Sequence, residues 1–258
     1  MTRQPRPGST WRRGVDVKPV YWLEQTQADV PAENDWLSAR ESVCLSGLRV
    51  AKRRADWRLG RWTAKCAVAS FLKLSMDAQD LAQIEIRPAS SGAPEIFIAN
   101  EPAAVAVSIS HSSGAAVCAV AKPGVELGCD QEVIEARSDV FVADYFTESE
   151  QVLVARVCAA ERSRLVTLLW SAKESALKAL REGLRLDTRS VTVSPINGGF
   201  NLNGWSPLQV RYADGRSFYG WWQQGHGMVR TLVANPAPDS PILLPAPTRF
   251  SDCASPSG

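Results

Sequence analysis

Two long segments with helical periodicity, set among short strand-like runs, limit the fold of this chain more than any other feature of its sequence. Apolar residues recur at steps of three and four over residues 51–74 and again over residues 164–181, where Gly183 ends the pattern. Between these segments lie three β-like runs, and a Lys-Pro-Gly turn separates the last two. We expect the three runs to form an antiparallel meander; they span residues 103–110, 115–121 and 125–132.

Further strand-like runs follow the second helical segment, at residues 191–193, 208–210 and 228–233. The predicted fold class is therefore α+β. The two ends of the chain lack such patterns. Residues 1–18 are predicted to form a flexible N-terminal arm, and residues 236–258 a Pro-rich C-terminal tail without regular helix or central strand. No internal sequence repeat is evident.

The composition excludes several classes of protein. With 258 residues, of which 45% are hydrophobic and 22% charged, the chain can bury a sizeable core. Its 29 basic and 27 acidic residues nearly balance, so bulk charge gives no reason to expect nucleic-acid binding. No run approaches the roughly 18 apolar residues of a membrane span, and six scattered cysteines without a CxxC pair fit reduced thiols. We expect a cytoplasmic protein that binds neither nucleic acid nor membranes.

Any catalytic chemistry must come mainly from carboxylates and cations. The chain has two histidines, His111 and His226, which leaves little material for a zinc site. It has no GxSxG elbow and no GxxxxGK[ST] loop, so a serine hydrolase and a P-loop kinase are both disfavoured.

Two acids stand close together in the segment Gly-Cys-Asp-Gln-Glu. Asp130 and Glu132 occupy positions i and i+2 of a predicted strand, so their carboxylates point to one face. Mg²⁺ suits such a pair because it takes oxygen ligands and commonly bridges one or two carboxylates to substrate phosphates. A solvated strand face would give the same spacing.

Glu174 and Lys178 are neighbours on the second helical segment, four residues apart and in the favourable order. As a surface ion pair they would contribute only a few tenths of a kcal/mol. In a functional site they would supply a third carboxylate and a cation.

Polar and basic groups elsewhere are suited to phosphate binding. The run from Ser108 to Ser112 ends a predicted strand with hydroxyls and the imidazole of His111, which can donate hydrogen bonds to phosphate oxygens. Residues 49–65 carry seven basic side chains against one acid, a pattern that fits either several bound phosphates or a solvated helix face. The seven are Arg49, Lys52, Arg53, Arg54, Arg58, Arg61 and Lys65.

The order of these segments resembles one known family. They are KRRADWRLGR (52–61), SGAP (91–94), SISHS (108–112), GCDQE (128–132), YFTESE (145–150) and WSAKESALK (170–178). Together they resemble the Sfp-type 4′-phosphopantetheinyl transferases from about residue 45 to 195, most strongly in WSAKESALK, which looks like the family's WxxKExxxK. The resemblance implies two similar α/β lobes, residues 19–122 and 123–235, with coenzyme A in the cleft between them.

Carried over by position, the resemblance implies a set of site residues. Asp130, Glu132 and Glu174 would hold Mg²⁺, with Mn²⁺ as an alternative. Glu174 would be the general base and Lys178 would stabilise charge, while Glu150 matches a second family acid and is the other candidate base. Coenzyme A would be contacted by Lys52, Arg53, Ser110, His111, Asp130, Lys173 and Lys178.

Two positions depart from the family's pattern. Gly92-Ala93-Pro94 stands where the family has GKP, so one cationic contact to the nucleotide is missing. Gln131 lies between the two metal acids where an aliphatic residue is usual, and strand alternation turns its amide toward the core, where it needs hydrogen-bond partners.

The predicted reaction is transfer of the 4′-phosphopantetheine group from coenzyme A to a serine of an apo acyl or peptidyl carrier protein. The released product would be 3′,5′-ADP, and we expect the enzyme to be a monomer. Two alternatives remain open at this point. One is a Mg²⁺-dependent phosphohydrolase acting on coenzyme A or a nucleotide, and the other is a module that binds phosphates on a carrier protein or nucleic acid without turnover.

Overall fold

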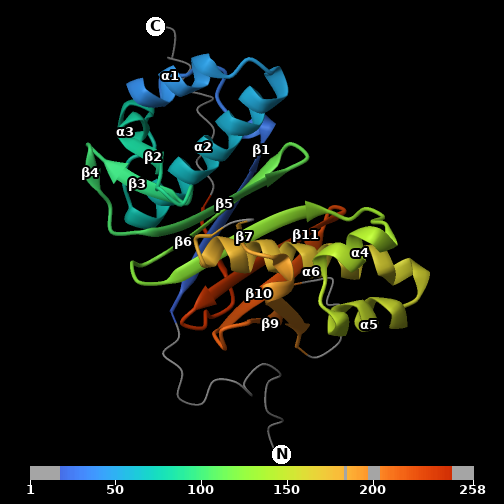
Figure 1. The fold of residues 1–258 in the computed structure, drawn as a ribbon. Helices are drawn as coiled ribbons and strands as arrows, with labels where there is room; N and C mark the ends of the chain where they lie inside the picture. The colour runs from blue at the N-terminus through green and yellow to red at the C-terminus, as the bar shows by residue number, and fades with distance from the viewer. Residues whose placement is uncertain (1–17, 183–184, 197–203, 246–258) are drawn as a thin grey trace, which may run out of the picture.

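The structure is a computed structural model, and it describes residues 18–182, 185–196 and 204–245. Gly183 and most of the predicted N-terminal arm lie outside the described residues, as do residues 246–258 of the predicted tail. The described chain is a mixed α+β fold, as predicted, with three sheets (Figure 1). None of its described helices is long and apolar enough to cross a membrane.

The first half of the chain builds two sheets and three helices. The long helix α2 agrees with the first segment of helical periodicity. In chain order the elements are β1 (Val20–Thr26), the 3-10 turn η1 (Gln27–Asp29), α1 (Ala39–Gly47), α2 (Ala51–Leu72), α3 (Ala78–Ala82), β2 (Ile84–Pro88), β3 (Pro94–Ile98), β4 (Glu101–Pro102), β5 (Ala106–Ser112) and β6 (Ala115–Ala121).

The described residues of the second half build one sheet and three α-helices, and they add an edge strand to the larger sheet of the first half. The long helix α6 begins before the predicted segment and ends at Ala179. In chain order the elements are β7 (Glu126–Val133), α4 (Asp139–Tyr145), α5 (Glu148–Arg156), α6 (Ala159–Ala179), the 3-10 turn η3 (Thr188–Ser190), β8 (Val191–Pro195), β9 (Ser206–Tyr212), β10 (Ser217–Gly225), β11 (Met228–Asn235) and β12 (Ile242–Leu243).

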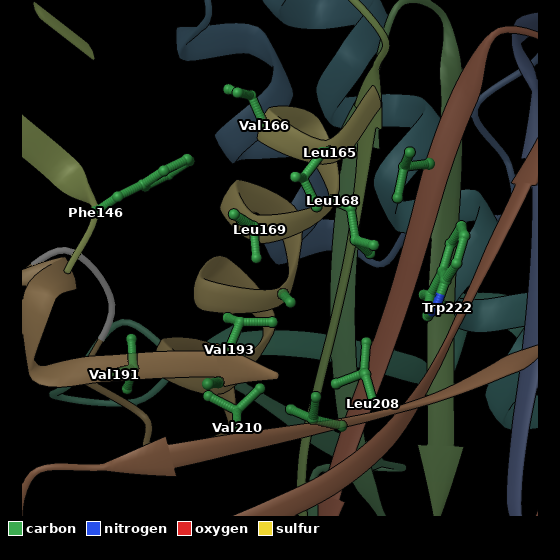
Figure 2. Close-up of a cluster of buried hydrophobic side chains, with 14 of the residues drawn as sticks. Phe146, Leu165, Val166, Leu168, Leu169, Val191, Val193, Leu208, Val210 and Trp222 are labelled. Carbon is green, nitrogen blue, oxygen red and sulfur yellow. The ribbon is translucent and has the colours of Figure 1, made fainter. Parts of the chain in front are cut away.

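The strands pair into a four-stranded sheet, β12-β1-β6-β5, a five-stranded sheet, β7-β11-β10-β9-β8, and a small sheet, β2-β3-β4. Helix α2 packs on β1 and β6, and α6 packs on β7 and β11 (Figure 1). Each long helix buries its apolar side against its own sheet. Figure 2 shows the second of these cores, where apolar side chains of α6 meet those of β8, β9 and β10.

The predicted meander is correct for one pair of strands only. β5 and β6 form an antiparallel hairpin, but β7 pairs with β11 and belongs to the other sheet. β7 instead lies against β5 and β6 through side chains, and a third core of buried residues fills the space between the two sheets. The short connection between β6 and β7 favoured a hairpin of these two strands. In the structure, β7 forms its backbone hydrogen bonds with the distant strand β11 instead.

The described part of the Pro-rich tail contacts both of the larger sheets. β12 is a two-residue strand at the sheet edge and runs parallel to β1, and the backbone N–H of Leu244 donates to Trp22 O at 2.8 Å. The indole N–H of Trp221 donates to Pro238 O at 3.2 Å. Proline is compatible with an edge position, so the prediction that these residues form no central strand agrees with the structure.

Candidate functional site

The two acids of the GCDQE segment face helix α6. Leu127 and Cys129 are buried in the core between the sheets, and strand alternation therefore turns Gly128, Asp130 and Glu132 to the opposite face. The backbone of Gly128 lies directly against the backbone of α6 at Ser175. This close approach brings the C-terminal half of α6 next to Asp130.

Asp130 and Lys178 form the centre of the site. The Lys178 ammonium donates to Asp130 Oδ1 at 2.8 Å and to the backbone oxygen of Cys129 at 3.0 Å. The hydroxyl of Ser110, from β5 of the other sheet, donates to the same Oδ1 at 2.7 Å. Burial is the largest single influence and would lower the pKa of Lys178, but the charge and hydrogen bond of Asp130, together with Cys129 and Glu174, outweigh it and raise this pKa above its ordinary value. Lys178 is therefore a fixed cation.

Two carboxylate oxygens beside this cation have no partner. Asp130 Oδ2 and Glu174 Oε1 are both buried without a hydrogen bond. Burial, and next the negative charge of Asp130, raise the pKa of Glu174 to about 7, although Lys178 opposes the shift. Unpartnered buried oxygens are rare in native proteins, so these two mark a place where a cation or a proton donor is needed.

Glu132 lies at the rim of this cluster. The Trp170 indole N–H donates to its Oε1 at 3.2 Å, and the Arg137 guanidinium lies 3.9 Å from its Oε2. Burial, followed by the charge of Asp130, raises the pKa of Glu132 above its ordinary value. In the described ranges, no three acidic, histidine or cysteine side chains form a ready-made metal cluster.

The structure does not bring Glu150 or Lys173 to this site. Glu150 is 1% exposed and Lys173 is 0% exposed, and they form an ion pair of 2.8 Å on the other side of α6. The other Glu150 oxygen accepts from the backbone N–H of Val193 at 2.7 Å. These contacts leave Glu150 without access to a substrate hydroxyl and Lys173 without access to a phosphate. The motif predicted both residues at the site. It could not show that Lys173 faces away from Glu174, because successive residues of a helix point in different directions.

A cleft between the two halves of the chain reaches Lys178. It has a volume of about 910 Å³, within the range of small-molecule sites. A smaller cleft of about 250 Å³ adjoins it and contains His111 and Arg61, with the Gly92 and Pro94 turn common to both. The larger cleft is lined by residues 91–97, 102–109, 123–127 and 178–181.

Lys52 and Arg53 lie outside both clefts. They are exposed on the first turn of α2, one helical turn before Asp56 and Trp57, which line the smaller cleft. Of the seven basic residues between 49 and 65, Lys65 is fully buried rather than on a solvated helix face. The cations near the smaller cleft are therefore Arg61 and Arg87, which line it, and the more distant pair Lys52 and Arg53.

Sequence reasoning missed some of these contacts. Trp170 stands in the WSAKESALK segment, but its hydrogen bond to Glu132 depends on how α6 lies over β7. Arg137, beside Glu132, stands in no motif. The prediction that Gln131 turns toward the core is confirmed: it is 1% exposed, and neither its amide nitrogen nor its oxygen has a hydrogen-bond partner.

Comparison with known proteins gives a family match for part of the chain. Residues 126–219 match the model of the 4′-phosphopantetheinyl transferase superfamily. This segment contains β7 and α6, with Asp130, Glu132, Glu174 and Lys178. The match confirms, at the level of the superfamily, the resemblance drawn from the motifs. Comparison with curated proteins gives no match.

Two solved structures are similar to part of the chain. A holo-(acyl-carrier-protein) synthase from Bacillus anthracis str. Ames, in complex with CoA (3′,5′-ADP), has 21% identity and a TM-score of 0.34, over 42% of this chain and 98% of that one. The holo-[acyl-carrier-protein] synthase of Helicobacter pylori, in complex with coenzyme A, has 17% identity and a TM-score of 0.32, over 40% of this chain and 98% of that one.

Proposed function

Because residues 126–219 match the model of the 4′-phosphopantetheinyl transferase superfamily, we propose that this protein transfers the 4′-phosphopantetheine group of coenzyme A to a serine of a carrier protein. One observation carries the proposal: two buried carboxylate oxygens without partners, on Asp130 and Glu174, lie beside the fixed cation Lys178 at the end of a two-sided cleft. Such a site is built to hold a metal ion and an anionic group together.

The residues present fit a divalent cation. Asp130 and Glu174 offer the free oxygens, and Glu132 lies one strand position further on the same face, where rotation of its side chain can add an oxygen. Mg²⁺ needs only one or two protein carboxylates because water and substrate phosphates complete its shell. When bound, the cation supplies charge neutralisation on the reacting phosphates. Mn²⁺ prefers the same kind of ligands.

The chain's own residues perform the remaining work. Asp130 fixes the Lys178 ammonium, which neutralises charge on the pyrophosphate of coenzyme A. The carrier serine Oγ forms a bond to the β-phosphorus, the bond from that phosphorus to the oxygen of 3′,5′-ADP breaks, and Glu174 accepts the serine proton. In the metal-free protein its pKa is about 7, and a bound cation would favour the ionised form that accepts a proton. Glu150, buried and fully bonded, is left out of this role.

Ser110, His111 and the α2 cations complete the proposed coenzyme A site. Ser110 holds Asp130 in place and His111 faces the smaller cleft, where it can donate to a phosphate oxygen. Lys52 and Arg53 would contact the 3′-phosphate only if that end of coenzyme A extends out of the smaller cleft toward the first turn of α2. We propose the two halves of the chain, residues 19–122 and 123–235, as the two lobes of the enzyme.

The Lys52→Ala/Arg53→Ala variant should raise the KM for coenzyme A about tenfold while kcat changes little. Contacts to a remote phosphate act equally in the ground state and the transition state, so their loss weakens binding. Dephospho-coenzyme A should be affected less. Arg211→Ala, at an exposed arginine of β9, is a control for the loss of charge. An equal loss with both substrates would remove the two residues from the 3′-phosphate site.

Metal affinity should increase as the pH rises from about 6 to about 8. Glu174, with its pKa of about 7, must lose its proton before it can bind a cation. Calorimetric titration with Mn²⁺ in two buffers of different ionisation enthalpy will count the proton released, and Glu174→Gln should release none. An affinity that does not change over this pH range would contradict Glu174 as a ligand.

Mass spectrometry of an apo carrier protein incubated with this protein, coenzyme A and Mg²⁺ tests the function. The expected result is one phosphopantetheine added to the carrier, with 3′,5′-ADP released in equal amount and no reaction in excess EDTA. Release of 3′,5′-ADP without carrier modification would support the phosphohydrolase instead. Carriers of fatty-acid, polyketide and peptide synthesis should be compared, because the site does not select among them. We propose a cytoplasmic monomer as the active form.

A further inference from the structure

A buried glutamate–lysine pair lies beneath helix α6, on the side away from the metal site. Glu150 is the third residue of α5 and forms a capping box with Thr147, while its other oxygen accepts from Val193 N in β8. Lys173 of α6 donates to Glu150 and to the backbone oxygens of Thr188 and Val191. One network thus ties α6 to the start of α5 and to β8.

The first half of the chain contains the same network. Glu41 is the third residue of α1 and forms a capping box with Ser38, while its other oxygen accepts from Ile86 N in β2 at 3.2 Å. Lys65 of α2 lies 2.6 Å from Glu41 Oε2 and donates to the backbone oxygens of Trp36 and Leu81 at 2.8 and 3.0 Å. Here the network ties α2 to the start of α1 and to the segments around it.

The aromatic neighbours of the two lysines correspond as well. The Lys65 ammonium lies 5.7 Å from the centre of the Trp36 ring, and the Lys173 ammonium lies 5.8 Å from the centre of the Phe146 ring. Both rings belong to fully buried side chains just before a capping box. Both lysines follow a tryptophan by three residues, in Trp62-Thr-Ala-Lys and Trp170-Ser-Ala-Lys.

The topology of the two halves makes these lysines equivalent. β1, β6 and β5 are neighbours in one sheet under α2, and β7, β11 and β10 are neighbours in the other sheet under α6. Each half runs strand, capped helix, long helix, then strands. The repeat is not evident from the sequence because the two halves share little more than the four-residue segment Trp-[Ser/Thr]-Ala-Lys.

The two halves differ at the residue after the lysine. Glu174 follows Lys173 and belongs to the carboxylate cluster, whereas Cys66 follows Lys65 and is hydrogen-bonded to Gln25 of β1. Cys66 is fully buried, and no acid of β1 faces it. The equivalent long helix and sheet therefore carry a charged site beside Lys173 in one half and an apolar core beside Lys65 in the other.

We propose that the Glu150–Lys173 pair is a positioning device for Glu174 and Lys178, and that the equivalent Glu41–Lys65 pair supports the fold alone. The proposal deepens the function proposed above and rests on it for the role of Glu174. The Lys173 ammonium is held by three acceptors from three elements, α5, η3 and β8, which fixes both the rotation of α6 and its shift along its own axis. The adjacent Glu174 and, one turn later, Lys178 are thereby aimed at Asp130.

The test compares two matched variants that each remove both charges of one pair. Glu150→Gln/Lys173→Met and Glu41→Gln/Lys65→Met keep side-chain size and leave the same kinds of backbone acceptors without a partner. Both should lower the melting temperature by several degrees, because buried polar groups lose partners in each. Circular dichroism will identify a temperature at which both variants are folded. At that temperature, Mn²⁺ affinity and kcat are measured.

Only the pair under α6 should affect the metal site. Glu150→Gln/Lys173→Met is expected to weaken Mn²⁺ binding about tenfold or more and to lower kcat by at least as much. Glu41→Gln/Lys65→Met should keep the Mn²⁺ affinity, and kcat at saturating coenzyme A, within about twofold, although Glu41 lies 3.8 Å from Arg61 of the smaller cleft. Equal losses in the two variants, or wild-type Mn²⁺ affinity in Glu150→Gln/Lys173→Met, would overturn the positioning role.

The two proposals can fail separately. If the wild-type protein binds Mn²⁺ but modifies no carrier, the transferase proposal fails, while the Mn²⁺ affinities of the two variants still decide the positioning role. If the wild-type protein modifies the carrier and Glu150→Gln/Lys173→Met binds Mn²⁺ normally, only the positioning role is lost. A wild-type protein that binds no Mn²⁺ refutes Glu174 as a ligand and the positioning role with it.

Discussion

Replacement of Glu174 by glutamine should lower kcat about a hundredfold or more, and in the absence of metal it should stabilise the protein above pH 7. The loss of rate follows from removing a metal ligand and the base of the reaction together, because charge stabilisation at a reacting phosphate is worth several kcal/mol. A surface ion pair between Glu174 and Lys178 would instead cost a few tenths of a kcal/mol on substitution and leave the rate unchanged.

The stabilisation follows from the raised pKa of Glu174. In the folded protein this pKa is about 7, above the ordinary 4.5 that the unfolded chain shows. Between these values the folded state holds the proton and the unfolded state does not, so the free energy of unfolding falls as the pH rises. Below about pH 4.5, where Glu174 is protonated in both states, the wild-type protein and Glu174→Gln should have similar free energies of unfolding. Above about pH 7 the glutamine variant should be more stable by about 1–3 kcal/mol, because it carries no buried charge.

Urea unfolding in EDTA at about pH 4.5 and about pH 8, followed by circular dichroism, measures this difference. Transfer to the carrier protein at saturating Mg²⁺ and coenzyme A measures kcat. Glu148→Gln, at an exposed glutamate in the first turn of α5, is the control for a neutralised carboxylate. Normal turnover by Glu174→Gln would return this face of α6 to a structural role and would remove the base from the proposed mechanism.

The elements that carry the site were predictable because their patterns are local. Residues 115–121 form one continuous apolar run under α2, and the 51–74 periodicity reflects one apolar face on one sheet, so both were found within a few residues. The partner of β7 was not predictable in this way. It is β11, about a hundred residues later, and a pattern of alternation contains no information about which distant strand it will pair with.

The same distinction separates the site residues that the structure brings together from those that it does not. Asp130, Glu132, Glu174 and Lys178 share one strand face and one helix face, and spacing alone places them together once β7 and α6 meet. Lys173 stands in the same segment as Glu174 and Lys178, and Glu150 in the YFTESE segment, yet the 100° step of a helix turns Lys173 away from its neighbour Glu174. Their burial depends on η3 and β8, which contribute the carbonyl groups. No local pattern predicts those.

Replacement of Gly128 by alanine should destabilise the protein by about 3 kcal/mol or more and should also abolish transfer. A methyl group at this position would overlap the carbonyl oxygen of Ser175 and would lie only 2.7 Å from its carbonyl carbon and 2.8 Å from Ala179 N. All three atoms belong to the backbone of α6, which cannot yield as a flexible side chain does, so either β7 or the helix must move.

That movement would separate the two halves of the site. Asp130 lies two residues from Gly128 on β7, and Lys178 lies one helical turn from the contact on α6, so a shift of the helix lengthens the 2.8 Å ion pair between them. Gly47→Ala is the matched control, because the added methyl group meets nothing within 4 Å on the exposed end of α1. There, the higher helix propensity of alanine should leave stability unchanged or slightly raised.

Denaturant titration of both glycine variants, followed by Mn²⁺ binding and transfer assays on whatever fraction remains folded, distinguishes packing from chemistry. If Gly128→Ala folds with wild-type stability, the close approach of α6 to β7 is wrong. If it folds less stably but still binds Mn²⁺ with wild-type affinity, the site does not depend on that approach. Loss of both properties together would explain why glycine begins the Gly-x-Asp-x-Glu segment: the strand must lie against the helix backbone before Asp130 can meet Lys178 and Glu174.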